Sequence, residues 1–376
     1  MKILHLLYDN PQNPWLGGGA ALRAKVITEH FSKKSDQIYF ISGGFPKSSA
    51  TNSSDKAHHF FTPHFESYIS SRLFFSLKAP SVIKKLKKEN DFDILVEDMS
   101  IFNILFPSLF WNGPMVSLVH NYLGCQSFKK LGIFGIIPFL LERHYLKSRK
   151  NYITVSKALK EHILKLNPSA NVEIIYNGID DKVFQNVKKS DADKIGFIGR
   201  IEINQKGLDT LVQALHILKQ SGFPFKAIII GGGKDENSLK QMIASLELND
   251  CVELTGRLAE ERFERLSECK VVCMPSRFEG WGIAAIEAAA EGIPVIAANI
   301  EGLNEAVQDK QTGILITASA QELAEELKAL LQDPTKMEQL STNAQSYAKK
   351  FRWENIASEQ RSFYERIIEN SDNARK

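Results

Sequence analysis

The chain has 376 residues, of which 43% are hydrophobic and 24% charged, a composition that excludes extensive disorder. Its length suits two domains better than one core. The formal net charge of +3 is unevenly spread: residues 1–185 contain 23 Lys and Arg against 15 Asp and Glu, a balance of +8, and the remainder has −5. Two interpretations of the basic half stay open, an ordinary solvated surface or one that rests on an anionic membrane.

We expect no export signal at the beginning of the chain. Its first apolar run, Ile3 to Tyr8, is followed by Asp9 and is shorter than the core of a signal peptide. No stretch approaches the ~18 continuous apolar residues of a membrane-spanning helix. The four cysteines lack the paired spacing of a zinc site. We therefore expect a cytoplasmic protein with free thiols and no bound metal.

Short apolar runs alternate with helical stretches from one end of the chain to the other. The runs are apolar on both faces, as is typical of parallel strands covered by helices. In the first half we predict strands near Ile3–Leu7, Ile38–Ile41, Ile94–Val96, Met115–Val119, Tyr152–Val155 and Val172–Ile175. In the second half we predict strands near Ile195–Ile198, Ala227–Ile230, Val252–Leu254, Val271–Met274, Val295–Ala297 and Ile314–Ile316. This repeated alternation predicts an α/β fold of two Rossmann-like, doubly wound parallel-sheet domains.

A polar segment after Asp180 marks the predicted boundary between the domains. We place the first domain at residues 1–185 and the second at 186–352, because a new strand begins at Lys194. Residues 45–81, rich in Ser, His and Phe, show no pattern that assigns an element. The tail after Pro334 is predicted to be helical.

Two features of the first domain are candidates for ligand binding. Gly17-Gly18-Gly19 lies between the first strand and a helix that begins near Ala20, where main-chain amides and the helix dipole favour an anion. A plain flexible turn is the alternative. His120 follows a strand end and suits a hydrogen-bond donor or proton handler, with a structural histidine as the alternative.

The second domain carries two cations close together in sequence. Arg200 lies just beyond a strand end, and Lys206 lies just before a helix. Two cations that converge at such a place suit a diphosphate. Surface charge on a loop is the alternative, and the position at the carboxyl end of the strand favours the binding interpretation.

The most specific motif runs from Pro275 to Glu287. A strand ends at Pro275, a glycine-rich turn follows, and a helix begins near Gly282. Glu279 lies in the turn near the positive end of that helix. Glu287 lies about two turns into the helix among Ala, Ile and Gly, which disfavours a simple solvated glutamate. Two acids so placed suit the hydroxyl groups of one extended ligand.

Together these elements resemble glycosyltransferase family 4, a retaining group with the GT-B fold, in which two Rossmann-like domains face each other across a cleft. The likeness is strong over residues 170–330 and patchy before them. The matching elements are Gly17-Gly18-Gly19, His120, Tyr176-Asn177-Gly178-Ile179-Asp180, Gly199-Arg200, Lys206-Gly207, Gly231-Gly232-Gly233, Gly256-Arg257, Glu279, Glu287 and Phe351-Arg352-Trp353-Glu354.

The resemblance implies a catalytic set of His120, Arg200, Lys206 and Glu279. Arg200 and Lys206 would hold the donor diphosphate in place of a divalent metal, so that neither a metal nor another cofactor is expected. His120 would contact the donor sugar near the reacting carbon, and Glu279 would hold that sugar. Catalysis would then rest on orientation and on stabilisation of the leaving group.

The resemblance also implies a set of donor-binding residues. Glu287 would bind the ribose, and Gly256 with Arg257 would lie beside the base. The remaining positions, which would contact the donor through turns and main-chain amides, are Gly17, Gly18, Asn177, Gly280, Trp281 and Gly282.

The first domain would be the acceptor side, with the C-terminal helix at about 353–371 packed back on it, and the second would bind the donor. We expect transfer of a hexose-type sugar from a nucleotide-diphosphate donor to a glycan or lipid-linked acceptor in cell-surface polysaccharide assembly, with no nucleic-acid partner. A nucleotide-sugar 2-epimerase and a non-catalytic two-lobed sugar-binding protein are the rival interpretations. The apolar stretch Leu131 to Leu141, flanked by basic residues, predicts either peripheral contact with an anionic membrane on its inner face or a buried helix.

Overall fold

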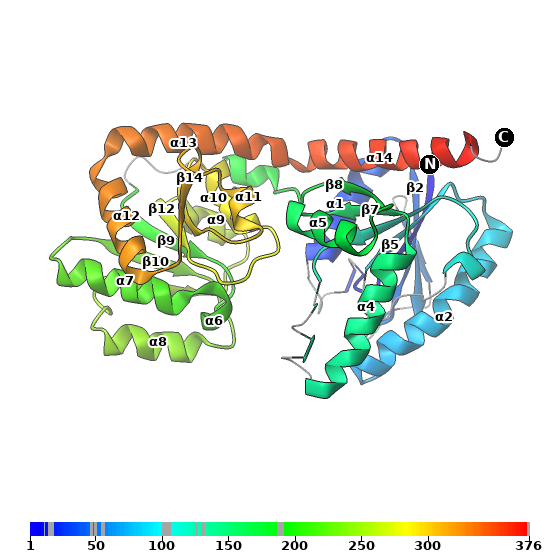
Figure 1. The fold of residues 1–376 in the computed structure, drawn as a ribbon, viewed down its shortest axis with the longest axis horizontal. Helices are drawn as coiled ribbons and strands as arrows, with labels where there is room; N and C mark the ends of the chain where they lie inside the picture. Colours follow the sequence, from blue (N-terminus) through cyan, green and yellow to red (C-terminus); the bar gives the residue numbers. More distant parts are fainter. Residues whose placement is uncertain are drawn as a thin grey trace. The chain divides into compact units, whose positions relative to one another are not determined.

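The chain forms two compact units in the computed structural model (Figure 1). The structure describes residues 1–10, 12–13, 19–45, 48, 51–53, 57–99, 107–122, 124, 127–128, 132–185 and 192–373. Unit 1 combines Met1–Asn177 with Trp353–Lys376, and unit 2 is Gly178–Arg352. Each unit is built on one sheet.

The sheet of unit 1 has eight strands. Their order is β3 (Thr51–Ser53), β4 (Ala57–Thr62), β2 (Gln37–Gly43), β1 (Lys2–Leu6), β5 (Ile94–Asp98), β6 (Met115–Val119), β7 (Asn151–Thr154) and β8 (Asn171–Ile174). Seven of them are parallel, and β3 alone pairs antiparallel, at the edge. The six strands predicted for this half are confirmed. The two that were missed, β3 and β4, lie in the segment whose pattern assigned no element.

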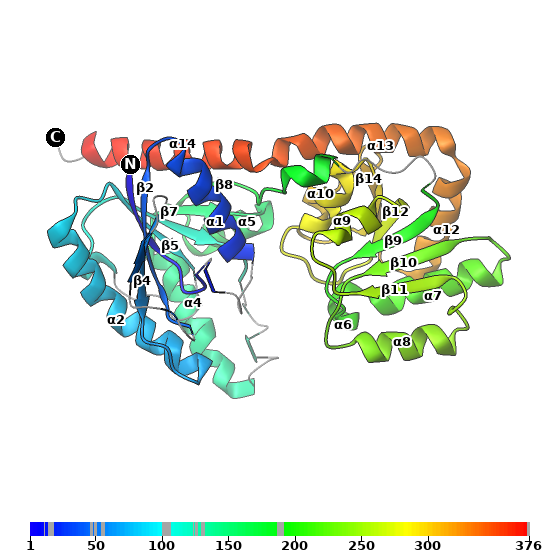
Figure 2. The ribbon, with the colours of Figure 1, turned by 180° about the vertical axis from the view of Figure 1, so that it is seen from behind.

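Helices cover both faces of this sheet. Alternate residues of β1 point to opposite faces, so Ile3 packs with α1 (Gly19–Ser32) and α14 (Trp353–Asn373), while Leu4 packs with α2 (Tyr68–Glu89). Figure 2 shows α1 and α14 beside each other and α2 apart from them. The other helical segments whose full bounds the structure describes in this unit are η1 (Pro107–Leu109), η2 (Gly132–Gly135), α4 (Ile136–Ser148) and α5 (Lys157–Leu166).

The sheet of unit 2 has six strands, all parallel. Their order is β11 (Val252–Gly256), β10 (Lys226–Ile230), β9 (Lys194–Ile198), β12 (Cys269–Met274), β13 (Val295–Ala298) and β14 (Gly313–Ile316). All six predicted strands are confirmed. In Figures 1 and 2, α7 (Leu208–Gln220) and α8 (Glu236–Ser245) lie on one side of the sheet, with α9 (Glu261–Leu266) and α10 (Ile283–Ala290) on the other.

The remaining helical segments of unit 2 are short or lie toward its end. They are η3 (Asp181–Gln185), α6 (Ile203–Lys206), α11 (Leu303–Ala306), α12 (Ala320–Gln332), α13 (Pro334–Ala348) and η4 (Lys349–Phe351). Within the described residues, no helix is both long and apolar enough to cross a membrane.

Both sheets change winding direction beside their first strand. In unit 1 the chain moves from β1 outward through β2 and then returns to the other side of β1 at β5; in unit 2 it does the same from β9 through β10 to β12. At such a switch point the two following loops diverge and leave a crevice at the carboxyl ends of the strands. The β1/β5 and β9/β12 pairs are therefore the places where each unit is expected to bind a ligand.

Candidate functional site

Two predicted catalytic residues meet at the switch point of unit 2. Lys206 ends α6, which follows β9, and Glu279 lies in the loop that follows β12. The Lys206 Nζ atom is 2.6 Å from Glu279 Oε2, and the two side chains are only 10% and 12% exposed. This ion pair is therefore shielded from water, and its charges act more strongly than those of a surface pair.

Close backbone packing holds the two loops together. Gly207 adopts a φ of +64°, and a Cβ atom there would lie 1.9 Å from the carbonyl oxygen of Pro275. The amides of Arg277 and Phe278 both donate to the carbonyl of Gln205, at 2.9 and 3.3 Å. Only glycine permits this approach, so Gly207 helps to place Lys206 against the β12 loop.

A surface ion pair reinforces the same contact. The guanidinium of Arg277, in the β12 loop, donates to both carboxylate oxygens of Asp209 at 2.9 and 2.7 Å. Such a bidentate geometry fixes direction as well as distance. The two loops thus form one preorganised element.

The turn before α10 is held by a buried tryptophan and leaves Gly280 exposed. Gly282 has a φ of +78°, and the Trp281 ring is 3% exposed and packs on Phe351 at 4.9 Å between ring centroids. A Cβ atom on Gly302 would lie 2.9 Å from the carbonyl oxygens of Glu279 and Gly280, which keeps that side of the turn closely packed. Trp281 therefore anchors the turn, and Gly280 is exposed.

Glu287 lies on α10, the helix that follows this turn. It is buried, at 9% exposure, and its Oε1 accepts from Arg262 of α9 at 3.0 Å. Burial raises the pKa of Glu287, and the charge of Arg262 opposes that shift. Arg262 was not singled out from the sequence, because it belongs to another helix and no local spacing links it to Glu287.

Two of the predicted cations, Arg200 and Arg257, do not join the Lys206–Glu279 ion pair. Arg200 follows β9 as expected, but its side chain is 66% exposed and pairs with Glu202 Oε1 at 2.9 Å. Arg257 is exposed after Gly256, whose φ is +70°. Neither contacts Lys206 or Glu279 in the described structure, and both lie exposed at the strand ends.

Unit 1 places His120 directly after β6. Its Nε2 lies 2.5 Å from Oδ1 of Asp98, the last residue of β5, and Asp98 Oδ2 lies 2.5 Å from His5 Nε2. Asp98 was missed by the sequence analysis, although the signal used for His120 applies to it equally: a polar residue at the carboxyl end of a buried strand.

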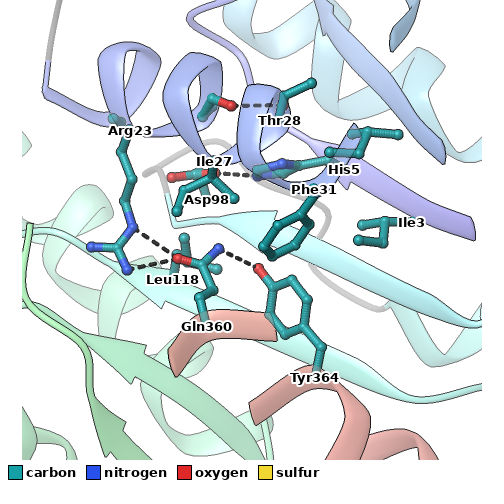
Figure 3. A pocket seen from close by; sticks show the side chains of 13 residues that line it. Ile3, His5, Arg23, Ile27, Thr28, Phe31, Asp98, Leu118, Gln360 and Tyr364 are labelled. Atoms are coloured by element: carbon teal, nitrogen blue, oxygen red, sulfur yellow. Dashed lines mark hydrogen bonds and ion pairs between the residues drawn. The ribbon is translucent and has the colours of Figure 1, made fainter. Parts of the chain in front are cut away.

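Asn177 belongs to a second polar cluster of unit 1, around a buried arginine. Arg23 Nη1 donates to Asn177 Oδ1 at 3.1 Å, and Arg23 also donates to Gln360 of α14 (Figure 3). Burial lowers the pKa of Arg23 to about 10. The Asn177 side chain is thus committed to a structural contact. Gly17 and Gly18 lie outside the described residues.

A metal cluster was not expected from the sequence. In the described part of the chain, no group of three or more His, Cys, Asp or Glu side chains is arranged to hold an ion.

Two family profiles match the chain one after the other. Residues 17–183 match the profile described as Glycosyltransferase Family 4, and residues 178–347 match glycosyl transferases group 1. The chain is 32% identical over 217 residues to an uncharacterized glycosyltransferase of Methanocaldococcus jannaschii. That alignment covers 57% of this chain and 59% of the relative, so the chain spans about three fifths of the relative's length.

Solved structures with the same architecture cover nearly the whole chain. Sucrose-phosphate synthase from Thermosynechococcus elongatus superposes with a TM-score of 0.81 at 20% identity, over 98% of this chain and 100% of that one. Alr3699/HepE of Anabaena, in complex with UDP-glucose, gives 0.71 at 19% identity over 99% and 100%. The two sheets and these neighbours define a protein of the GT-B glycosyltransferase fold. The chain belongs to the glycosyltransferase family 4 type of glycosyl transferases group 1.

Proposed function

We propose that the protein is a retaining glycosyltransferase that moves a hexose-type sugar from a nucleotide-diphosphate donor to a glycan or lipid-linked acceptor in cell-surface polysaccharide assembly. The observation that carries the proposal is the shielded Lys206–Glu279 pair at the switch point of unit 2. A buried cation suits the charge that develops on a leaving diphosphate, and a carboxylate beside it suits sugar hydroxyl groups.

The other residues take roles that fit their surroundings. Arg200 and Arg257, both exposed at strand ends, would add charge to the diphosphate and contact the base. Glu287, oriented by Arg262, would accept from the ribose hydroxyls. His120 would contact the sugar. In this scheme the two cations near β9 do the work that a divalent metal does in other transferases.

A nucleotide panel tests the proposal. We expect the nucleoside diphosphate of the correct base, and its sugar conjugate, to raise the melting temperature of the protein, because a ligand that binds only the folded state stabilises it. At 100 times Kd the gain is about 2.7 kcal/mol, or several degrees for a domain of this size. The shift should persist in EDTA.

Two controls make the panel decisive. The corresponding nucleoside and free sugar should shift the melting temperature far less, since both lack the diphosphate. Product analysis without acceptor separates transfer from 2-epimerisation, which needs no acceptor. Absence of any shift with millimolar nucleotides would overturn the proposal and favour a sugar-binding protein.

We propose in addition that unit 1 contacts an anionic membrane through η2 and the start of α4. The sequence left a buried helix as the alternative, and the exposed apolar side chains at the start of this segment favour the membrane contact. Ile133 and Phe134 are 81% and 75% exposed, and Ile137 and Leu140 are each 56% exposed. Further along α4, Lys147 is exposed as well. An apolar tip followed by a cation suits insertion below anionic headgroups.

Vesicle sedimentation tests this contact. We expect Phe134→Ser with Ile137→Ser to weaken binding to phosphatidylglycerol vesicles more than tenfold, because each apolar side chain contributes about 1.5–3 kcal/mol when buried. Leu109→Ser is the matched control, since Leu109 is 69% exposed in η1 and lies outside this segment. If the wild-type protein fails to sediment with anionic vesicles, the membrane contact is wrong.

A further inference from the structure

Asp98 joins two histidines at the switch point of unit 1. It ends β5, between β1, which carries His5, and β6, after which His120 follows. Each carboxylate oxygen of Asp98 lies 2.5 Å from one imidazole Nε2. Figure 3 shows the His5 side of this bridge beneath α1. The same position in unit 2, after β9 and β12, holds the Lys206–Glu279 pair.

The charge of Asp98 determines which nitrogen of each imidazole carries a proton. Burial alone would raise the pKa of this carboxyl, but hydrogen bonds from His120 and His5 bring it below its usual range. An ionised carboxylate accepts hydrogen bonds and cannot donate them. Each imidazole must therefore carry a proton on Nε2 and donate it to Asp98.

The two histidines differ in how far their rings are exposed. The His5 side chain is 8% exposed and stacks on Phe40 with ring centroids 5.1 Å apart, so it faces the core. The His120 side chain is 19% exposed. No group in the described part of the chain hydrogen-bonds its Nδ1 atom. The free edge of His120 therefore carries Nδ1, the nitrogen that Asp98 does not contact.

We propose that Asp98 is a positioning residue that fixes the tautomer and ring orientation of His120, so that Nδ1 is the atom presented to the donor sugar. With Nε2 protonated, a neutral His120 accepts a hydrogen bond at Nδ1 and therefore selects a sugar hydroxyl there. His5 occupies the second oxygen of Asp98 and restrains rotation of the carboxylate. This inference rests on the proposed glycosyl transfer.

Nitrogen-15 NMR of the histidine rings tests the proposal in the full-length protein. The His120 signals are assigned by their loss in His120→Gln. In the wild-type protein we expect the Nε2–H tautomer for His120. In Asp98→Asn we expect a mixture of tautomers, because an amide can donate to Nε2 as well as accept from it. With the active donor, kcat should fall about tenfold while the Kd of the bare nucleotide stays unchanged.

Asp36→Asn is the matched control. Asp36 is also a buried aspartate of unit 1, and it accepts a hydrogen bond from Arg361 Nε at 2.8 Å. The Asp36→Asn variant therefore shows how the loss of a buried carboxylate charge affects the structure when His120 is not involved. It should leave the His120 tautomer unaltered. An Nδ1–H tautomer in the wild-type protein, or equal effects of Asp36→Asn and Asp98→Asn on kcat, would overturn the proposal. If no donor is turned over at all, the proposed function fails, while the tautomer measurement still tests Asp98 by itself.

Discussion

Replacing Lys206 by alanine is expected to lower kcat for sugar transfer by about 10²- to 10³-fold. The ammonium group is held 2.6 Å from Glu279 at only 10% exposure, so its field is weakly screened by water. As the bond to the donor sugar breaks, negative charge grows on the diphosphate, and a preplaced cation stabilises that transition state more than the ground state. The main loss should therefore appear in kcat, measured with radiolabelled donor once the nucleotide panel has identified it.

The choice of control variants separates this effect from a general loss of charge or stability. Lys182 Nζ also lies 2.6 Å from a glutamate, Glu260, but this lysine is 53% exposed. Lys182→Ala should therefore leave kcat within about twofold, as expected for a surface pair. Lys206→Arg keeps the charge and should recover part of the rate.

Glu279→Gln provides the complementary test. It removes the carboxylate but keeps the amide oxygen beside Lys206, so we expect a smaller loss than for Lys206→Ala. If Lys206→Ala and Glu279→Ala both turn over donor at the wild-type rate while remaining folded by circular dichroism, the assigned roles are wrong.

The strands were predictable because their residues are buried on both faces. A run such as Ile228–Ile230 has no polar position that would suit any other element. By contrast, β4 contains His58 and His59, which are not typical of a buried strand. The helix α2 contains Pro80, a residue that disfavours the interior of a helix. Their identity is set by the sheet edge and by tertiary packing, which local sequence does not record.

The site was predictable where its residues follow adjacent strands. Lys206 and Glu279 are separated by 73 positions in sequence, yet β9 and β12 are neighbours in the sheet, so the loops after them begin side by side. The partners of the predicted residues were not predictable in this way. Arg262 reaches Glu287 from a separate helix, and Asp98 reaches His120 only because β5 and β6 pair in one particular register.

A second glutamate lies at the C-cap of α10, in buried surroundings that disfavour a charge. Glu291 follows Glu287 by one helical turn and is fully buried. In the described structure, neither of its carboxylate oxygens has a hydrogen-bond partner. Burial, with the nearby charge of Glu287, raises the pKa of Glu291 to about 9. The folded protein therefore holds this side chain as a neutral acid at pH 7.

The protonated state has a direct consequence for stability. An acid whose pKa is higher in the folded state than in the unfolded state takes up a proton on folding, so its contribution falls as pH rises between the two values. For Glu291 this window extends from the ordinary value of 4.5 to about 9. Within it, each pH unit lowers the free energy of unfolding by about 1.4 kcal/mol, which amounts to about 3 kcal/mol at pH 7.

Replacing Glu291 by methionine is therefore expected to stabilise unit 2 by about 3 kcal/mol at pH 7, because the thioether fills similar space and needs no proton. The gain should shrink toward pH 5 and grow toward pH 9. Hydrogen exchange of α10 and β12 amides measures it within unit 2, which avoids assuming that the whole chain unfolds in one step. Glu338→Met, at an exposed position on α13, should show no such dependence. A gain for Glu291→Met that is equal at pH 5 and pH 9 would mean that the carboxyl is not held protonated by burial.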